Sequence, residues 1–232
     1  MRIALVTAHP DDAEIFAGGI VAAYRRMGAE VAIVVATDGA KGGPGDPRDL
    51  ARRRAAEARA GAALLGAELM LLGFPDGALA AAPDFAARLA DRLAAVAPDL
   101  VLSHGPHDYH ADHRAVAQAA AAAVSFRAPL AWLDTPMGVG QQPTHYVDIT
   151  ADDDLKARAI LCHASQDPHR FVEQARLQAR FRAAQCGHDG FAEAIRHEPA
   201  FPFADIRALL PAPPPMRPLR DRRADTAPSG AA

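Results

Sequence analysis

The chain has 232 residues, and half of them are hydrophobic, which is enough to form the core of one sizeable domain. Its formal net charge of −3 gives no general electrostatic reason to bind nucleic acid or an anionic membrane surface, and no apolar stretch approaches the length of a membrane span. Only two cysteines are present, Cys162 and Cys186, so we expect no disulfide framework and predict a cytoplasmic protein that acts on small molecules.

Apolar runs alternate with longer Ala-, Leu- and Arg-rich helical patterns, which is typical of a mostly parallel sheet with crossover helices. We predict one α/β domain over residues 1–210, a Rossmann-like doubly wound sheet with strand order about 3-2-1-4-5 and flanking helices. The predicted strands are Ile3–Thr7, Val31–Thr37, Leu69–Leu72, Leu100–Ser103, Leu130–Leu133 and Tyr146–Ile149. The predicted helices are Ala13–Met27, Arg48–Leu65, Pro83–Val96, Asp112–Val124, Asp152–Cys162 and Phe171–Cys186.

Particular residues mark the ends of these elements. Pro83 and Asp112 are candidates for the first turn or cap of their helices, and Gly28 and Gly66 are candidates for helix stops. Residues 211–232 are rich in Pro, Ala and Arg, so we predict a disordered tail there without a catalytic part.

Two polar segments follow the first and fourth predicted strands. His9-Pro10-Asp11-Asp12 comes after the first strand, and His110-Ala111-Asp112-His113 comes after the fourth. In the predicted order these strands are neighbours at the point where the sheet reverses direction, so the two segments should meet. Two imidazoles and a carboxylate form a three-ligand zinc set with a fourth position left for water, and Asp11 and His110 remain free to transfer protons.

Each residue also has an interpretation without a metal. A lone His-x-x-His is a weak signal, because His104, His107, His110 and His113 are also compatible with a polar loop. Asp12 and Asp112 are both plausible helix N-caps. However, Asp11 and Asp12 are adjacent carboxylates at a strand end, and they would repel one another without a cation or proton. A metal explains the combination most simply.

A dinucleotide-binding module is the competing explanation for a strand, loop and helix at the start of a chain. The loop opposes it, because it has no Gly-x-Gly-x-x-Gly and would bring Asp11 and Asp12 against a pyrophosphate. Gly18 and Gly19 lie inside the next helix, where we expect them to allow close packing. The glycine-rich segment 39–45 predicts a mobile surface loop that borders the site.

The two polar segments identify a family resemblance. Ala8 to Glu14 and His110 to His113 resemble the zinc-dependent N-acetylglucosaminyl deacetylases of the PIG-L/LmbE-like superfamily, which remove acetyl groups from amino-sugar conjugates. The resemblance covers roughly residues 1 to 195. Further blocks that resemble the family are Thr37-Asp38-Gly39, Arg54-Ala55-Ala56-Glu57, Leu72 to Gly77, Lys156 with His163 to Gln166, and Phe191 to Ala194.

The resemblance assigns roles to single residues. Three side chains would ligate zinc: His9, Asp12 and His113. Asp11 would take a proton from the attacking water, and a protonated His110 would stabilise the developing oxyanion and protonate the leaving amine. Asp112 is placed to orient His110. Fe(II), Co(II) and Mn(II) are compatible with the same ligands.

The family comparison also suggests that Arg54 and Asp76 contact the sugar. Their alternatives are an exposed helix charge for Arg54 and a Pro-Asp-Gly turn for Asp76. Asp108-Tyr109 differs from several family members, which leaves the pocket wall and the substrate choice open. His163 and Gln166 are compatible with support of the site or with a buried interior position.

We therefore predict a zinc-dependent hydrolase that uses metal-activated water to remove the N-acetyl group of an N-acetylglucosamine-type conjugate. The first alternative is an amidase that cleaves a larger amide, such as a thiol-conjugate amide. The second is a non-catalytic sugar-binding module, which Asp11 opposes because binding alone needs no proton acceptor. The Ala-rich helix faces are compatible with a homo-oligomer.

Overall fold

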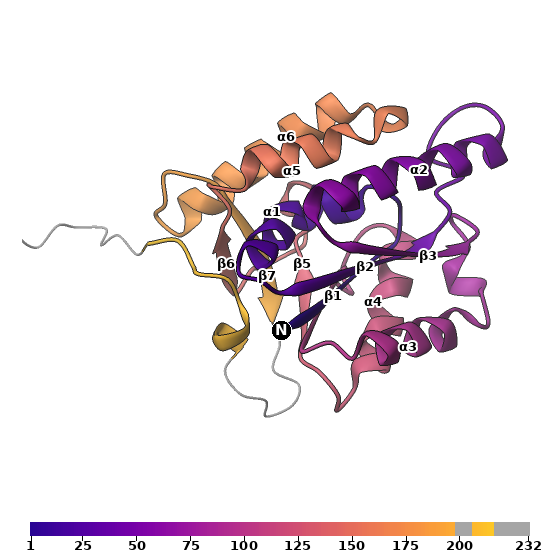
Figure 1. Cartoon of the computed structure of the whole chain (residues 1–232), viewed down its shortest axis with the longest axis horizontal. Helices are drawn as coiled ribbons and strands as arrows, with labels where there is room; N and C mark the ends of the chain where they lie inside the picture. The colour runs from indigo at the N-terminus through magenta and orange to yellow at the C-terminus, as the bar shows by residue number, and fades with distance from the viewer. Residues whose placement is uncertain (198–205, 216–232) are drawn as a thin grey trace, which may run out of the picture.

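The computed structural model describes residues 1–197 and 206–215, which form a sheet between two layers of helices (Figure 1). The sheet has seven strands in the order β3-β2-β1-β4-β5-β7-β6. Neighbouring strands run parallel from β3 to β5, whereas β7 is antiparallel to both β5 and β6. The strands are β1 Arg2–Thr7, β2 Glu30–Thr37, β3 Glu68–Phe74, β4 Leu100–Ser103, β5 Leu130–Leu133, β6 His145–Asp148 and β7 Ala192–His197.

Helices cover both faces of the sheet. In Figure 1, α1, α2, α5 and α6 lie above the strands and α3 and α4 lie below them. The α-helices are α1 Asp12–Arg26, α2 Pro47–Leu65, α3 Phe85–Val96, α4 Ala111–Val124, α5 Asp153–Leu161 and α6 Pro168–Gln185. Short 3-10 helices are η1 Leu79–Ala81, η2 Pro136–Gly138, η3 Ala164–Gln166 and η4 Ile206–Leu209.

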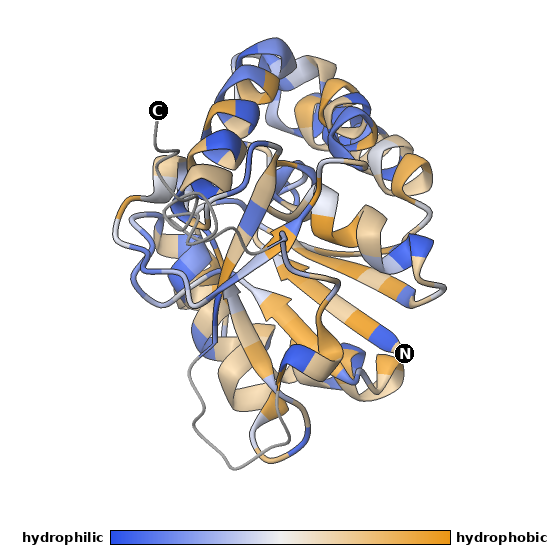
Figure 2. Ribbon diagram, turned by 90° about the vertical axis from the view of Figure 1, so that its left-hand side faces the viewer, coloured by the Kyte–Doolittle hydropathy of each residue, from blue (hydrophilic) through white to orange (hydrophobic). Residues whose placement is uncertain are grey.

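The central strands are apolar along their length because both of their faces are covered. In β1, Leu5 is fully buried and pairs with Ile33 of β2 and Leu102 of β4. Alternate residues of β1, β2 and β4 enter two separate cores, one under each layer of helices. Figure 2 shows this as hydrophobic strands inside a more hydrophilic shell of helices. The predicted α/β class and the order 3-2-1-4-5 are confirmed.

Local sequence accounts for several helix ends. Asp46 caps α2 by accepting hydrogen bonds from the backbone N–H groups of Arg48 and Asp49, and the helix ends at Gly66 with φ 69°. Gly28 follows α1 with φ 80°, so both predicted glycine stops are confirmed. Pro83 lies in the turn before α3, and Asp112 is in the first turn of α4.

Strand β7 is absent from the predicted elements, and its burial depends on partners distant in the sequence. Its Glu193 is 5% exposed, accepts hydrogen bonds from the backbone N–H groups of Gly19 and Ile20, and pairs with Lys156 at 2.6 Å. A Cβ atom on Gly18 would lie 2.9 Å from Cγ of Lys156, so the predicted close packing at these glycines is confirmed.

The segment after β7 is described in part. Pro211 and Pro214 are buried, and the backbone N–H of Asp148 donates to the carbonyl of Ala212 at 3.4 Å. The rest of the predicted tail, residues 216–232, lies outside the described residues, as do residues 198–205 at the end of the predicted domain. Among the described helices, none is both long and apolar enough to span a membrane.

Candidate metal centre

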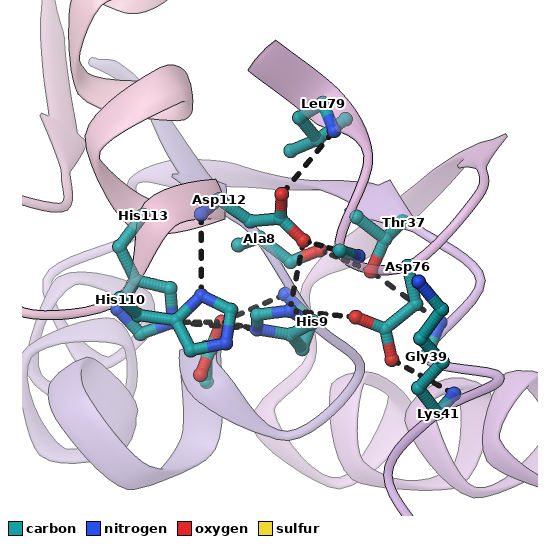
Figure 3. A network of polar contacts seen from close by, with 12 residues as sticks. Ala8, His9, Thr37, Gly39, Lys41, Asp76, Leu79, His110, Asp112 and His113 are labelled. Carbon is teal, nitrogen blue, oxygen red and sulfur yellow. Dashed lines mark hydrogen bonds and ion pairs between the residues drawn. The ribbon is translucent and has the colours of Figure 1, made fainter. Parts of the chain in front are cut away.

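The two polar segments meet at the carboxyl ends of β1 and β4. Residues 8–11 connect β1 to α1, and residues 104–110 connect β4 to α4. Since β1 and β4 are paired neighbours, both connections leave the sheet at the same edge. Figure 3 shows the result, with His9 lying between the two histidines of α4's first turn, His110 and His113, and Asp76.

Three ligand atoms form a nearly equilateral triangle in this cluster. Nδ1 of His9 lies 3.3 Å from Oδ2 of Asp12 and 3.3 Å from Nε2 of His113, and the third side, from Asp12 to His113, is 3.4 Å. In a tetrahedral zinc site with bonds of about 2.0–2.1 Å, neighbouring ligand atoms are about 3.3–3.4 Å apart. The geometry of these residues therefore fits a tetrahedral divalent ion with one position left over.

The charges around the imidazoles also call for a cation. Burial alone would lower the pKa of His9, but its contacts with Asp112, Asp12 and Asp76 raise that pKa to about 12. Burial likewise opposes the charge on His113, whose pKa is raised to about 9 by Asp12 and Asp108. Several buried carboxylates thus surround a small volume and favour positive charge there, which protons on the imidazoles or a bound metal ion would supply.

His104 is a support for the site that the sequence analysis treated only as part of a polar loop. Its Nε2 lies 3.2 Å from Oδ2 of Asp12, which also places it in a ligand-like group with Asp12 and His113. However, Nε2 already accepts a hydrogen bond from the backbone N–H of Ala8 at 3.1 Å. The ring stacks on His113 with centroids 3.7 Å apart, so we interpret His104 as packing that orients His113.

Asp108 is a second support that sequence reasoning did not assign. Its Oδ2 contacts Nδ1 of His113 at 2.9 Å, and its Oδ1 accepts a hydrogen bond from the backbone N–H of His110 at 2.9 Å. A carboxylate on one ring nitrogen fixes the histidine tautomer and directs the other nitrogen, here Nε2, toward a metal. The one feature of the sequence that could have indicated this role is the position of Asp108, an acidic residue five positions before the candidate ligand His113.

Replacing Asp108 by asparagine should weaken metal binding about 10- to 100-fold, because His113 loses the carboxylate that orients its ring. Titration with a competing chelator would measure this change. The exposed neighbour His107 provides a control, since His107→Ala leaves the Asp108 contacts intact. Equal metal affinities for Asp108→Asn and the unchanged protein would contradict this role.

Metal affinity should also increase with pH. The raised pKa values of His9 and His113 mean that both rings hold protons at neutral pH in the metal-free protein, and a metal must displace these protons. The same protons stabilise the metal-free fold fully below pH about 6.5, and this contribution is lost as the pH rises through the folded pKa of His113, about 9. Chelator titrations at pH 6, 7, 8 and 9 should show a higher metal affinity at each higher pH. A metal affinity that does not change with pH would exclude competition between protons and the metal for these rings.

Asp11 lies beside the triangle on a strained backbone. It is the N-cap of α1 with φ 134° and ψ −26°, and its side chain makes no cap hydrogen bond. Such a conformation in a residue other than glycine costs about 1–3 kcal/mol, and it persists only where the surroundings enforce it. Burial raises the pKa of Asp11 to about 7, against the opposing effect of the Arg54 guanidinium. A carboxyl with a pKa near neutrality can accept and return a proton.

His110 lies at the N-terminus of α4, where a backbone contact fixes its neutral tautomer. Its Nδ1 accepts a hydrogen bond from the backbone N–H of Asp112 at 3.2 Å, so the neutral ring carries its proton on Nε2. Burial, with repulsion from His9 and His113, lowers the pKa of His110. In its neutral form the ring can donate a hydrogen bond from Nε2, and the role of a protonated His110 stays a prediction.

The side chain of Asp112 has partners other than the expected His110. Its carboxylate accepts hydrogen bonds from the backbone N–H groups of Gly77 and Leu79 and lies 3.5 Å from Nε2 of His9. Asp76 lies on the same nitrogen of His9, at 3.2 Å. Both carboxylates therefore contact Nε2 of His9, and this orients its Nδ1 toward the triangle. The N-cap of α4 is His110 and not Asp112.

A cleft opens over the triangle, and two chemically different groups of residues line it. The first group is polar, is called here the polar wall and includes Lys41, Gly42, Arg54 and Asp76, so the glycine-rich loop borders the site as predicted. The second group is largely apolar and is called here the apolar wall. It consists of Ile15, Phe16, Tyr109, Pro136 and Phe171. Arg54 is not the exposed helix charge of the alternative interpretation, because it is only 3% exposed and lies 3.1 Å from Asp11.

Comparisons with known proteins identify similar sequences and folds. The family model described as PIG-L, GlcNAc-PI de-N-acetylase, matches residues 4–124. A diacetylchitobiose deacetylase of Thermococcus kodakarensis is 29% identical over 235 residues, with 88% of each chain covered. A 4-oxalmesaconate hydratase of Pseudomonas putida is 30% identical over 188 residues, covering 70% of this chain and 73% of the relative. The structure of an N,N'-diacetylchitobiose deacetylase from Pyrococcus horikoshii superposes with a TM-score of 0.77 at 27% identity, with 88% of each chain covered.

Proposed function

Because the chain belongs to the PIG-L family of de-N-acetylases, we propose that it is a zinc-dependent hydrolase that removes the acetyl group from an N-acetylglucosamine-type conjugate. Water is added across the amide C–N bond, and the products are acetate and a free amine. The observation that carries the proposal is the ligand triangle of His9, Asp12 and His113, with the near-neutral carboxyl of Asp11 beside it. This combination suits hydrolysis better than a structural metal site, which would use a fourth protein ligand.

Protein side chains would carry the proton transfers. His9, Asp12 and His113 would hold a divalent metal, which would lower the pKa of a water molecule and polarise the amide carbonyl. Asp11 is the base that accepts a proton from the attacking water, and its ion pair with Arg54 keeps its carboxylate oriented. His110 donates a hydrogen bond from Nε2 to the carbonyl oxygen as negative charge develops there. The proton held by Asp11 is then available to the leaving amine.

The polar groups of the cleft suit an amino sugar. They include the carboxylates of Asp11, Asp12 and Asp76 and the cations Lys41 and Arg54, of which Arg54 is already paired with Asp11. Hydroxyl groups of an amino sugar can hydrogen-bond to these polar groups. The apolar wall suits the aglycone or a larger acyl group.

A hydratase is the competing function, because a similar sequence and a similar solved structure from Pseudomonas putida KT2440 are described as hydratases. Their names, 4-oxalmesaconate hydratase and 4-carboxy-2-hydroxymuconate hydratase, describe carboxylate substrates. The match of residues 4–124 to the de-N-acetylase family model favours the deacetylase.

The experiment is acetate release from a panel of N-acetylglucosamine glycosides. Protein as purified, chelator-stripped protein and stripped protein with zinc restored would be compared. We expect release that is lost on stripping and recovered with zinc. Release of amine only from larger amides would favour the amidase, water addition to unsaturated carboxylates would favour the hydratase, and sugar binding without turnover would favour the binding module.

A further inference from the structure

We propose that Arg54 is a positioning residue that joins the glycine-rich loop to Asp11, rather than a substrate ligand. The inference depends on the proposed hydrolase function only for its kinetic test. Its structural part depends on contacts among Arg54, Asp11 and residues 39–42, and these contacts can be measured without a substrate.

Both terminal nitrogens of Arg54 already have partners within the protein. Nη1 donates to the carbonyl of Gly39 at 3.0 Å, and Nη2 donates to the carbonyl of Pro10 at 2.7 Å while lying 3.1 Å from Oδ1 of Asp11. The remaining nitrogen, Nε, is buried without a hydrogen-bond partner among the described residues. With 3% of the residue exposed, a sugar hydroxyl has little surface of Arg54 to contact.

The same guanidinium holds both parts of the strained segment. It binds the carbonyl that precedes Asp11 and the carboxylate of Asp11 itself, so it opposes rotation of the peptide unit between Pro10 and Asp11. Asp11 has φ 134°, and a residue other than glycine relaxes from this conformation unless its surroundings hold it. Arg54 therefore holds the backbone and the carboxylate of Asp11 in place.

Close approach to Arg54 explains why the loop carries glycine at two positions. A Cβ atom on Gly39 would lie 2.7 Å from Nη1 of Arg54, and one on Gly42 would overlap the same nitrogen. At the adjacent Gly43, by contrast, the nearest atom to a Cβ is Cδ2 of Leu50, at an ordinary 3.7 Å. The backbone at positions 39 and 42 thus lies directly on the guanidinium, and Gly43 does not.

This arrangement connects one wall of the cleft to the base. The loop also carries Lys41, which lines the cleft and whose backbone N–H donates to Oδ2 of Asp76 at 2.9 Å. Asp76 in turn contacts His9. If the glycine-rich loop moves, Arg54 should therefore move with it and displace Asp11. The polar wall of the cleft and the proposed base Asp11 should thus change position together.

A double-mutant cycle tests the contact without a substrate. Gly42→Ala should lower the free energy of unfolding measured in urea, whereas Gly43→Ala should leave it nearly unchanged. In an Arg54→Lys background, which keeps the charge but removes the Nη1 and Cζ atoms, Gly42→Ala should have little further effect. An Arg54→Gln background is the second variant if the first is poorly folded. Equal effects of Gly42→Ala in all backgrounds would overturn the contact.

Kinetics separate a positioning role from substrate binding. Arg54→Lys should lower kcat about 10²-fold through misplacement of Asp11, with KM nearly unchanged. Guanidinium ion added to an Arg54→Ala variant should restore part of kcat. A raised KM with normal kcat would show that Arg54 binds substrate and would overturn the inference. If the unmodified enzyme hydrolyses no amide, the proposed function fails, and the urea cycle still decides the contact.

Discussion

Replacing Asp11 by asparagine should lower kcat by about 10²- to 10⁴-fold while metal binding is retained. Asparagine has nearly the same shape as aspartate and adds no steric demand, so the strained backbone at φ 134° should survive. It can still accept a hydrogen bond from Arg54, but it cannot take a proton from water. Acetate release and metal content, measured on the same preparation, would check both parts of the expectation.

A matched control removes a carboxylate outside the site. Asp46 caps α2, and Asp46→Asn keeps the cap acceptor while making the same change in charge. We expect this variant to retain full turnover. Unchanged kcat in Asp11→Asn would exclude Asp11 as the base and would favour a binding role for the cleft.

Replacing His113 by alanine should remove both metal binding and turnover. His113 supplies one corner of the triangle, 3.3 Å from His9 and 3.4 Å from Asp12, and the remaining two ligands cannot hold a tetrahedral ion tightly. The loss of metal affinity should exceed the 10- to 100-fold expected for its supporting partner Asp108, because a ligand is removed and not only reoriented. Metal content after dialysis and acetate release measure the two effects.

His107 provides the comparison within the same loop. It is exposed and lies three residues before His110, so His107→Ala should keep the metal and the activity. If the His113→Ala variant bound metal as tightly as the unchanged protein, a group other than His113 would have to be the third metal ligand. The alternative set of His9, His110 and His113 would then be excluded as well, since it also contains His113.

Much of the fold could be predicted from the pattern of apolar residues. The predicted bounds of strands such as Leu100–Ser103 and Leu130–Leu133 agree with the structure. In a domain of this class, a short continuous apolar run is typical of a strand buried on both faces. Strand β7 could not be predicted in this way. Its Glu193 interrupts the apolar pattern, and that charge is buried only because Lys156 and the backbone of α1 meet it from elsewhere in the chain.

The candidate site was predictable where a residue type and its position after a strand pointed to the same chemistry. His9, Asp12 and His113 are of this kind, and the structure brings their ligand atoms within 3.3–3.4 Å of one another. Their role as metal ligands stays a prediction. The supporting contacts were less predictable, because Asp108 and His104 act on His113 through ring orientation and stacking that no spacing specifies.

Local sequence alone specified the first six strands and the six α-helices in chain order, the strand ends at which polar residues gather and the types of ligand available. Apolar periodicity and residue chemistry are properties of short segments, so they can be read without the tertiary structure. The tertiary structure decided which donor faces which acceptor. It turned Asp112 away from His110 toward Gly77 and Leu79, and it buried Arg54 against Asp11. Such choices depend on burial and on the mutual electrostatics of groups far apart in the chain, so they arise only when the β1 and β4 loops, α2 and the glycine-rich loop are packed together.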